Sequence, residues 1–314
     1  MKLILAPLAG FTSAPFRKLC AAHGADLTYT EMVSAAGLAH GSSPTRHLME
    51  VLPGEGPVAC QIFGSKPEEL ALATAEASKL DRFTEINLNA GCPMPKIVHE
   101  GAGAALIKDP QHVHNCLAAM VRETTLPVTL KTRPGPRPDK VLLLELLDAA
   151  ETAGCLGITL HGRFTSQMHG GATHLDLLAE IAARAKVPVT GNGSVVDAKS
   201  AAAMAATGVD VIMVGRAALA DPFIFARLKG NEPPAESPAA LCARHLGYLL
   251  DFRDRLAAAY PRDHVPPPDS FAAVKMHTHL FRYFNGRPGA AKLRARLNSV
   301  RTLAEIYDIM HAYV

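Results

Sequence analysis

Eight short runs of apolar and β-branched residues recur along the first two-thirds of the chain, and most are followed by a segment with helical patterning. The runs are almost continuously hydrophobic, which is typical of parallel strands buried on both faces. Eight strand–helix repeats within about 230 residues predict an α/β fold of the (β/α)8 TIM-barrel type. The runs span residues 3–9, 27–32, 58–63, 84–89, 128–133, 157–161, 187–191 and 211–214.

An open, doubly wound sheet is the alternative that such a repeat must be tested against. No G-x-G-x-x-G turn follows any of the runs, so a dinucleotide-binding sheet lacks the turn that would hold its phosphates.

Residues typical of helix N-termini precede several of the predicted helices. We expect Asp109, Asp139 and Asp197 to cap the helices that follow them, and Ser65 to form a capping box with Glu68.

Cysteine and histidine usage argues against a metal centre or a disulfide framework. The six cysteines contain no Cys-x-x-Cys pair, and the 14 histidines contain no His-Glu-x-x-His pattern. Free thiols are typical of a reducing compartment, so we expect a cytoplasmic protein. The N-terminus has no signal-peptide pattern and no apolar run has membrane-spanning length, so we expect no membrane association.

Polar or cationic residues stand at the end of nearly every predicted strand. Catalytic groups of TIM barrels lie at the carboxyl ends of the strands, so this pattern predicts a functional mouth there. In chain order, the strand ends carry Pro7, Leu8, Ala9, Glu31, Gln61, Asn87, Asn89, Cys92, Lys131, Arg133, His161, Arg163, Asn192, Gly193, Ser194, Gly215 and Arg216.

The last two strand ends predict a phosphate site. The small-residue turns at Gly193 and Gly215 leave backbone N–H groups free at helix starts, and Arg216 adds positive charge. Lys131, at the end of the fifth strand, could stabilise an anionic ring such as a reduced flavin. A structural ion pair between Lys131 and Glu31 or Glu85 is the alternative.

Cys92 lies between Gly91 and Pro93, in a loop that follows the fourth predicted strand. A cysteine kept for packing usually lies within an apolar periodic segment, and this one does not. The residues alone leave a functional and a structural role equally open for Cys92.

A change in composition near residue 231 predicts a domain boundary. Proline and polar residues dominate the stretch up to residue 238, and helical patterning follows it. We therefore expect a barrel domain of residues 1–232, a linker of residues 233–238 and a helical domain of residues 239–314.

The C-terminal region is basic. Residues 240–314 hold 11 Lys and Arg against 6 Asp and Glu, and residues 275–301 contain no acidic residue. Such a stretch predicts contacts with the phosphates of a nucleic acid, and a solvated helical face is the alternative. Its cations are Lys275, Arg282, Arg287, Lys292, Arg294, Arg296 and Arg301.

Several motifs, in the same order along the chain, make the sequence resemble the bacterial tRNA-dihydrouridine synthases. The segment from Asn89 to Lys96, with the glycines at 101 and 103, resembles the active-cysteine motif of that family. The flavin-site motifs of the same family resemble, in order, the segments of this chain around Leu8, Gln61, Lys131, His161, Gly193 and Arg216. Leu8, Ser194 and Pro134 depart from the family pattern.

The resemblance implies FMN-dependent reduction of the C5–C6 bond of a uridine in tRNA, with NADPH as reductant and NADH as the alternative. Cys92 would donate the proton to C5. The implied cofactor residues are Pro7, Leu8, Ala9, Gln61, Lys131, His161, Asn192, Gly193, Ser194, Gly215 and Arg216. The implied substrate and RNA contacts are Asn89, Lys96, Arg163, Lys275, Arg282, Lys292, Arg294 and Arg296.

Two other functions fit part of the pattern. A barrel of the dihydroorotate dehydrogenase type would use FMN on a free pyrimidine, although it needs no basic helical domain. A non-catalytic RNA-binding barrel would need no flavin. No feature of the sequence indicates an obligate protein partner.

Overall fold

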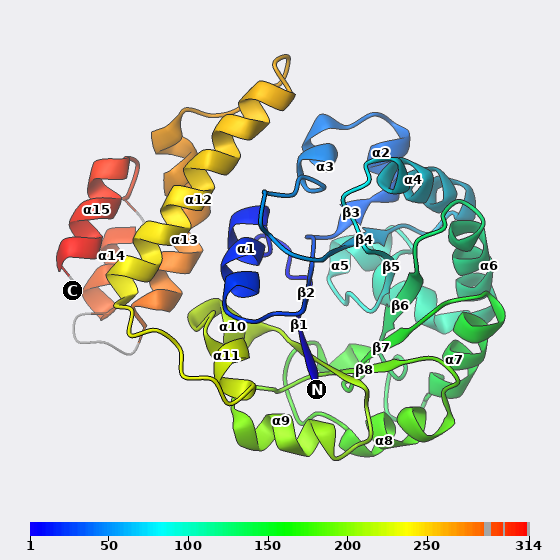
Figure 1. The fold of residues 1–314 in the computed structure, drawn as a ribbon. Coiled ribbons are helices and arrows are strands. Elements are labelled where there is room, and N and C mark those ends of the chain that lie inside the picture. The colour runs from blue at the N-terminus through cyan, green and yellow to red at the C-terminus, as the bar shows by residue number, and fades with distance from the viewer. Residues whose placement is uncertain (286–289, 298, 313–314) are drawn as a thin grey trace.

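The protein was analysed as a computed structural model, which describes residues 1–285, 290–297 and 299–312. Its strands are all parallel and surround a central axis, with helices outside them (Figure 1). The strands are β1 (Lys2–Leu5), β2 (Leu27–Tyr29), β3 (Val33–Ser34), β4 (Val58–Phe63), β5 (Glu85–Ala90), β6 (Val128–Thr132), β7 (Ile158–His161), β8 (Val189–Asn192) and β9 (Val211–Val214).

Eight of these strands close into a barrel. Neighbours are paired in the order β2-β1-β9-β8-β7-β6-β5-β4, and the pairing of Thr28 with Val58 joins β2 to β4. The two-residue strand β3 stands outside the ring and pairs with the end of β4. The predicted strand of residues 27–32 is therefore shorter than expected, but the TIM-barrel prediction is confirmed.

Helices cover the outside of the barrel (Figure 1). In this part of the chain they are α1 (Ala14–Ala22), α2 (Ala35–Ala39), α3 (Ser43–His47), α4 (Pro67–Lys79), α5 (Pro95–His99), α6 (Pro110–Val121), α7 (Leu143–Thr152), α8 (Leu175–Arg184), α9 (Ala198–Ala205), α10 (Arg216–Ala220) and α11 (Ile224–Leu228). Two 3-10 segments, η1 (Gly103–Lys108) and η2 (Thr165–Gln167), lie in the loops.

Two of the predicted helix caps are confirmed. The Asp109 carboxylate accepts the His112 N–H at 3.0 Å at the start of α6. The Asp197 carboxylate accepts the Ser200 N–H at 2.8 Å at the start of α9. Each cap satisfies a backbone donor that the first helical turn leaves unpaired.

The other two predicted caps are wrong. Ser65 does not cap α4, because its hydroxyl donates to the Glu100 carbonyl at 3.0 Å, and Lys66 is the residue that precedes the helix. Asp139 does not start α7, because its carboxylate binds Arg137 and the helix begins at Leu143. In both cases a tertiary or loop contact competes successfully for the side chain.

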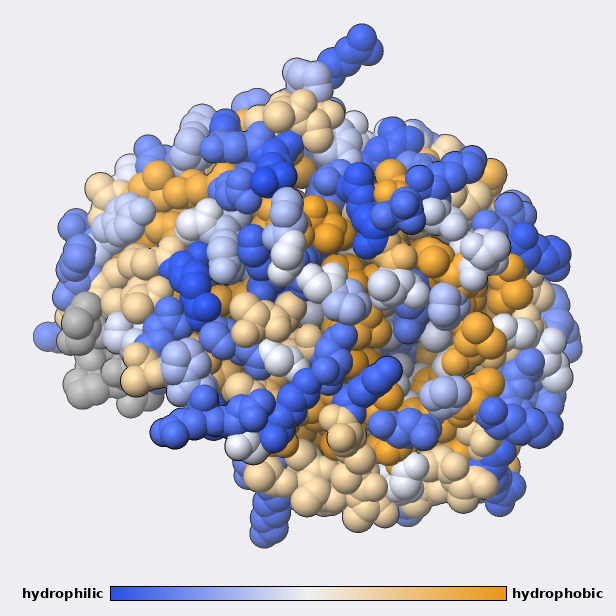
Figure 2. Space-filling model, in the orientation of Figure 1, coloured by the Kyte–Doolittle hydropathy of each residue, from blue (hydrophilic) through white to orange (hydrophobic). Residues whose placement is uncertain are grey.

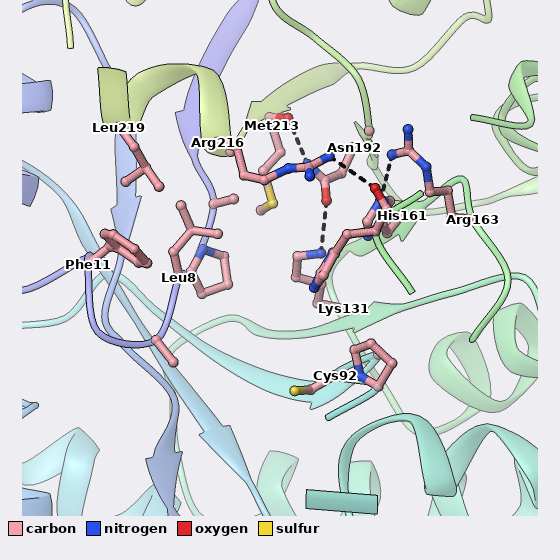
Figure 3. Close-up of a pocket in the computed structure, with 18 of the residues that line it drawn as sticks. Leu8, Phe11, Cys92, Lys131, His161, Arg163, Asn192, Met213, Arg216 and Leu219 are labelled. Atoms are coloured by element: carbon pink, nitrogen blue, oxygen red, sulfur yellow. Dashed lines mark hydrogen bonds between the residues drawn. The ribbon is translucent and has the colours of Figure 1, made fainter. Parts of the chain in front are cut away.

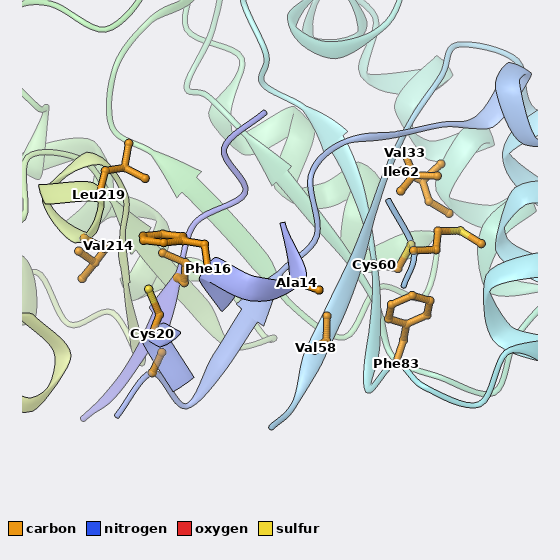
Figure 4. Close-up of a cluster of buried hydrophobic side chains, with 14 of the residues drawn as sticks. Ala14, Phe16, Cys20, Val33, Val58, Cys60, Ile62, Phe83, Val214 and Leu219 are labelled. Atoms are coloured by element: carbon orange, nitrogen blue, oxygen red, sulfur yellow. The ribbon is translucent and has the colours of Figure 1, made fainter. Parts of the chain in front are cut away.

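One large hydrophobic core connects the sheet, the surrounding helices and the C-terminal helices. Figure 4 shows Phe16 and Cys20 of α1 beside Val214 of β9, and Phe16 and Val214 are both fully buried. Burial of such side chains contributes the main favourable term in folding. The space-filling view shows hydrophilic and hydrophobic side chains intermixed over the face of the molecule seen in Figure 1 (Figure 2).

The C-terminal region contains α12 (Pro238–Ala259), α13 (Pro268–Tyr283), α14 (Ala290–Leu297) and α15 (Leu303–Ala312). Ser237 caps α12 by accepting the Ala240 N–H at 3.2 Å. These helices pack against the barrel through ring contacts of Phe16 with His245 and His279. The division into domains at residues 232 and 239 stays a prediction. Among the described residues, each helix is too short or too polar to span a lipid bilayer.

Candidate active site

A cavity of about 440 Å³ opens at the carboxyl ends of the barrel strands. Figure 3 shows Leu8, Phe11 and Leu219 on one side of it and Lys131 and His161 on the other, with the Cys92 sulfur pointing toward the space between. Most of the predicted site residues line this cavity. They are Pro7, Leu8, Ala9, Asn89, Cys92, Lys131, His161, Arg163, Asn192, Gly193, Ser194, Gly215, Arg216 and Arg282.

The remaining predicted residues do not line the cavity. Gln61 is fully buried beneath it, and Lys96 is exposed on α5. Lys275 is exposed on α13 and lines a second cavity. Lys292 and Arg296 are exposed on α14. The side chain of Arg294 and the whole of Arg287 lie outside the described part of the chain.

The loop after β5 is held by Asn89 and by a close glycine contact. The Asn89 Oδ1 atom accepts the N–H groups of Gly91 at 3.1 Å and of Cys92 at 2.9 Å. Gly103 has a φ of +58°, and a Cβ atom there would lie 2.7 Å from the Cys92 carbonyl oxygen. This close approach requires glycine, since any side chain would displace the cysteine.

A continuous chain of hydrogen bonds runs from this loop into the barrel interior. The Asn89 Nδ2 atom donates to Gln61 Oε1 at 2.9 Å, and Gln61 Nε2 donates to Asn87 Oδ1 at 2.7 Å. Asn87 Nδ2 then donates to Thr129 Oγ1 at 2.7 Å, and that hydroxyl donates to Glu85 at 2.6 Å. The bonds run in one direction from Asn89 to Glu85, whose half-buried carboxyl group accepts the last of them. Buried polar networks of this kind fix side chains in one arrangement.

The Cys92 thiol is half-buried and lies among cations. Burial raises its pKa, while the Met94 N–H, Arg133 and Lys131 oppose that rise. The pKa remains above the ordinary thiol value, so the side chain is protonated at neutral pH. Such a thiol is suited to proton donation, and the adjacent cations stabilise the thiolate that donation leaves.

Lys131 projects from the end of β6 toward Asn192. Its Nζ atom donates to Asn192 Oδ1 at 3.1 Å, and Asn192 is held in turn by its own bond to the Met213 carbonyl at 2.9 Å. Neither Glu31 nor Glu85 is its hydrogen-bond partner, so the alternative of a structural ion pair is not observed. Burial and the charge of Arg133 lower the Lys131 pKa to about 7, and an anion in the cavity would restore its charge.

Arg163 joins two loops at the rim of the cavity. Its Nη2 atom donates to the Gly171 carbonyl at 2.9 Å and to Ser194 Oγ at 2.5 Å. Ser194 has a φ of +54°, an uncommon conformation for a residue with a side chain. Burial, with Lys131 and the arginines nearby, strongly lowers the pKa of His161, which is therefore neutral.

The turns after β8 and β9 leave several backbone N–H groups unpaired. Among the described residues, the amides of Ser194 and Val195 have no acceptor, and Arg216 opens α10 with the free donors of a first helical turn. Arg216 also reaches across to the His169 carbonyl at 3.2 Å. Free amides and an arginine at one end of the cavity are groups that could hold an anion.

Comparison with known proteins agrees with this geometry. The sequence pattern of the dihydrouridine synthase family matches residues 4–312. The chain belongs to the dihydrouridine synthase family. It is 35% identical over 322 residues to tRNA-dihydrouridine synthase B of Escherichia coli K12, covering 99% of this chain and 95% of that protein. It is 30% identical over 312 residues to the protein of the same name from Yersinia pestis, with the same coverage of both chains.

A third relative covers less of the chain. The tRNA-dihydrouridine synthase B of Klebsiella pneumoniae is 36% identical over 229 residues, which is 73% of this chain and 71% of that protein. The resemblance to the tRNA-dihydrouridine synthases that the motifs indicated is therefore confirmed. Within the described residues, no group of three or more His, Cys, Asp or Glu side chains could hold a metal ion.

The sequence pattern indicated no role for Arg133, which lies buried at the cavity edge. Its Nε atom donates to the Gly91 carbonyl at 2.8 Å, and its Nη1 atom to the Phe164 carbonyl at 3.1 Å. Arg133 is 1% exposed and has no carboxylate partner in the part of the chain that the structure describes. Its place at a strand end was visible in the sequence, but its contacts were not.

Other residues that line the cavity were also not predicted from the sequence. Phe11, His169 and Leu219 line the cavity, and none of them stands at the end of a predicted strand. Phe11 lies under the Arg282 guanidinium, whose carbon is 5.0 Å from the ring centre. No local signal identifies these residues, because two loops and α10 bring them to the mouth from separate parts of the chain.

Proposed function

We propose that this protein reduces the C5–C6 bond of uridines in tRNA to give 5,6-dihydrouridine, with bound FMN and with NADPH or NADH as the reductant. One observation carries the proposal. A protonated thiol, Cys92, lines the same cavity as Lys131 and the anion site at Ser194 and Arg216. The relatives named tRNA-dihydrouridine synthase B support the choice of substrate.

The cavity fits a flavin mononucleotide in size and in the distribution of polar groups. Its volume of about 440 Å³ lies in the range of cofactor pockets. Leu8 and Met213 give apolar contact for a planar ring, while Lys131 offers a cation whose only hydrogen-bond acceptor among the described residues is Asn192. The free amides of Ser194 and Val195 would hold the single phosphate.

The chemistry that bound FMN would supply is hydride transfer to C6 of the uracil, with electrons that come from the nicotinamide cofactor. Cys92 then donates its thiol proton to C5 through Sγ. The π bond between C5 and C6 is lost, a C–H bond forms at each carbon, and the cysteine becomes a thiolate. Lys131 and Arg133 stabilise that thiolate until it takes a proton from water.

Asn89 contributes to the reaction by holding the Cys92 loop in place. Its carboxamide oxygen is occupied by the loop N–H groups and its nitrogen by Gln61, so it holds Cys92 at a fixed height above the barrel. Gln61 acts in the same indirect way, because its carboxamide is fully buried and bonded to Asn87 and Asn89. Support of the loop is thus one role of Asn89, and its predicted contact with the base from the cavity wall stays a prediction.

Contacts to RNA would come from cations outside the cavity. A uridine within folded tRNA must leave its stack to reach the barrel mouth, at a cost of a few kcal/mol. Lys96 is exposed beside the Cys92 loop, Arg282 reaches the cavity from α13, and Lys292 and Arg296 are exposed on α14. Phosphate contacts at these positions would offset the cost of extrusion.

The test is turnover of unmodified tRNA by the purified protein with FMN and NADPH, measured as dihydrouridine by mass spectrometry of the digested RNA. We expect dihydrouridine in tRNA and little reduction of free uridine. Equal turnover of the nucleoside would contradict the RNA assignment and favour the free-pyrimidine alternative. A protein that binds tRNA but neither holds nor takes up FMN would favour the non-catalytic alternative.

A further inference from the structure

A second cavity, of about 340 Å³, lies between the barrel and the C-terminal helices. Its walls are mainly apolar and include Leu48, Phe252, Phe271 and Val274. Phe252 comes from α12 and Phe271 from α13, whereas Leu48 follows α3 of the barrel. The cavity is thus formed jointly by the two parts of the chain.

The second cavity is a direct neighbour of the active-site cavity. Leu8 and Phe11 line the first cavity, and Ser13, two residues further on, lines the second. Helix α13 also lines both, through Arg282 at the first and Lys275 at the second. Seven helical residues span about 10 Å, a separation that a few nucleotides of an unstacked strand can bridge.

Glu31 fixes the wall between the cavities. Its side chain lines the second cavity, and its carboxylate accepts the Gly10 N–H at 2.5 Å. Gly10 lies between Ala9 and Phe11, both of which line the first cavity. The two spaces therefore share a wall that is held by a hydrogen bond.

The groups around the second cavity suit a nucleobase and its phosphate. Arg17 is already bound to Glu55 and to the Glu50 carbonyl, and His47 is bound to Asp263. Lys275, in contrast, is exposed and has no carboxylate partner among the described residues. An apolar slot with an unpaired cation at its rim matches the way proteins bind an unstacked base and its backbone.

We infer that this second cavity binds a further nucleobase of the same RNA, a few nucleotides from the uridine that is reduced. The inference rests on the proposed function, since it takes its substrate from there. Val274 and Phe271 would contact the base, and Lys275 would contact its phosphate. A pair of base pockets sets the distance between two extruded nucleotides, so the second cavity selects the uridine that enters the first.

Two substitutions on α13 test the inference kinetically. Val274 is 73% exposed and lines the second cavity, whereas Thr278 is exposed on the same helix and lines neither cavity. A new carboxylate at residue 274 would meet the RNA, so Val274→Glu should raise the KM for tRNA about tenfold with kcat nearly unchanged. The matched control Thr278→Glu should change KM by less than about threefold.

Cross-linking of the wild-type protein to tRNA gives an independent readout. We expect ultraviolet irradiation to join RNA to peptides containing Phe252, Phe271 or Val274, as identified by mass spectrometry. Equal KM values for the two variants would overturn the second site, as would cross-links confined to the Cys92 loop. In both cases dihydrouridine would still form, so the proposed function would stand. Absence of dihydrouridine with wild-type protein would overturn the proposed function and this inference together.

Discussion

The Oδ1 atom of Asn89 accepts the backbone N–H of Cys92 at 2.9 Å, which joins the proposed proton donor to the interior of the barrel. From Asn89 the hydrogen bonds continue through Gln61 and Asn87 to Thr129 and finally Glu85. The position of the thiol above the sheet is therefore set by a hydrogen-bond network that extends to Glu85 at the start of β5. Proton transfer depends on such placement within hydrogen-bond reach of the reacting carbon.

Loss of the Asn89 side chain should reduce turnover without removing the thiol. Asn89→Ala leaves the N–H groups of Gly91 and Cys92 without their acceptor, so we expect kcat to fall about 10- to 100-fold with FMN content unchanged. Asn89→Asp keeps the acceptor and should recover part of the rate. The rate at which iodoacetamide alkylates Cys92 reports directly on the position of the Cys92 loop. Asn115→Ala, at an exposed site on α6, is the control, and equal alkylation rates in all variants would argue against the positioning role.

Removal of the thiol should greatly slow uridine reduction but leave flavin reduction by NADPH intact. In Cys92→Ala we expect dihydrouridine formation to fall roughly 10²- to 10⁴-fold, the usual contribution of a general acid. NADPH oxidation by the bound flavin should continue, because it needs no proton from this residue. Cys155→Ala, at a buried cysteine outside the cavity, is the matched control and should keep its product yield. Near-normal product formation by Cys92→Ala would exclude the acid role.

Replacement of Lys131 should weaken cofactor binding but stabilise the folded protein. The pKa of Lys131 falls from 10.5 to about 7 on folding, so between these values the unfolded chain binds more protons than the folded protein. The free energy of unfolding of the flavin-free protein should therefore rise with pH through this window. Lys131→Met should raise Tm at pH 7 by a few degrees and weaken FMN binding at least about tenfold.

Thermal unfolding at several pH values and flavin titration measure these two effects. Lys79→Met, at an exposed position on α4, should alter neither. A Lys131→Met protein that is less stable at pH 7 than the wild type would show that the lysine is kept for folding.

The exposed cations of α14 should determine part of the salt dependence of RNA binding. Each phosphate contact contributes roughly 0.7–0.9 to the slope of log K against log salt concentration. Lys292→Ala with Arg296→Ala should thus flatten the slope by about 1.5 and leave the FMN content unchanged. A double variant at Lys79 and Lys199, both exposed on the barrel helices, is the charge-matched control. If its slope changes by the same amount, α14 has no special role in contacting RNA.

Periodicity and strand-end chemistry were enough to predict the barrel and most of its lining residues. The hydrophobic runs specify parallel strands, and the closure of eight of them brings their carboxyl ends together. Lys131, Asn192 and Cys92 therefore meet in one cavity, as expected. The helix caps at Asp109 and Asp197 were predictable for a similar reason, because the partner of each lies three residues away.

Predictions that depended on distant partners were less successful. Ser65 forms no cap because the Glu100 carbonyl, 35 residues away, takes its hydroxyl. Gln61 lies near the end of β4, and its side chain meets Asn87 and Asn89, contacts that the sequence pattern did not indicate; its role toward the cofactor stays a prediction. The direction in which a strand-end side chain points depends on the register between strands, and sequence pattern leaves that open.

The sequence by itself determined that this chain forms a parallel barrel with a cysteine, a lysine and two small-residue turns at its mouth, since strand order and strand-end residues follow from local pattern. Only the tertiary structure decided what Asn89 and Arg133 bind, and that α13 brings Arg282 to one cavity and Lys275 to another. The physical reason is that hydrogen bonds and packing join residues far apart in the chain. Their geometry is fixed only when the barrel closes and the C-terminal helices pack against it.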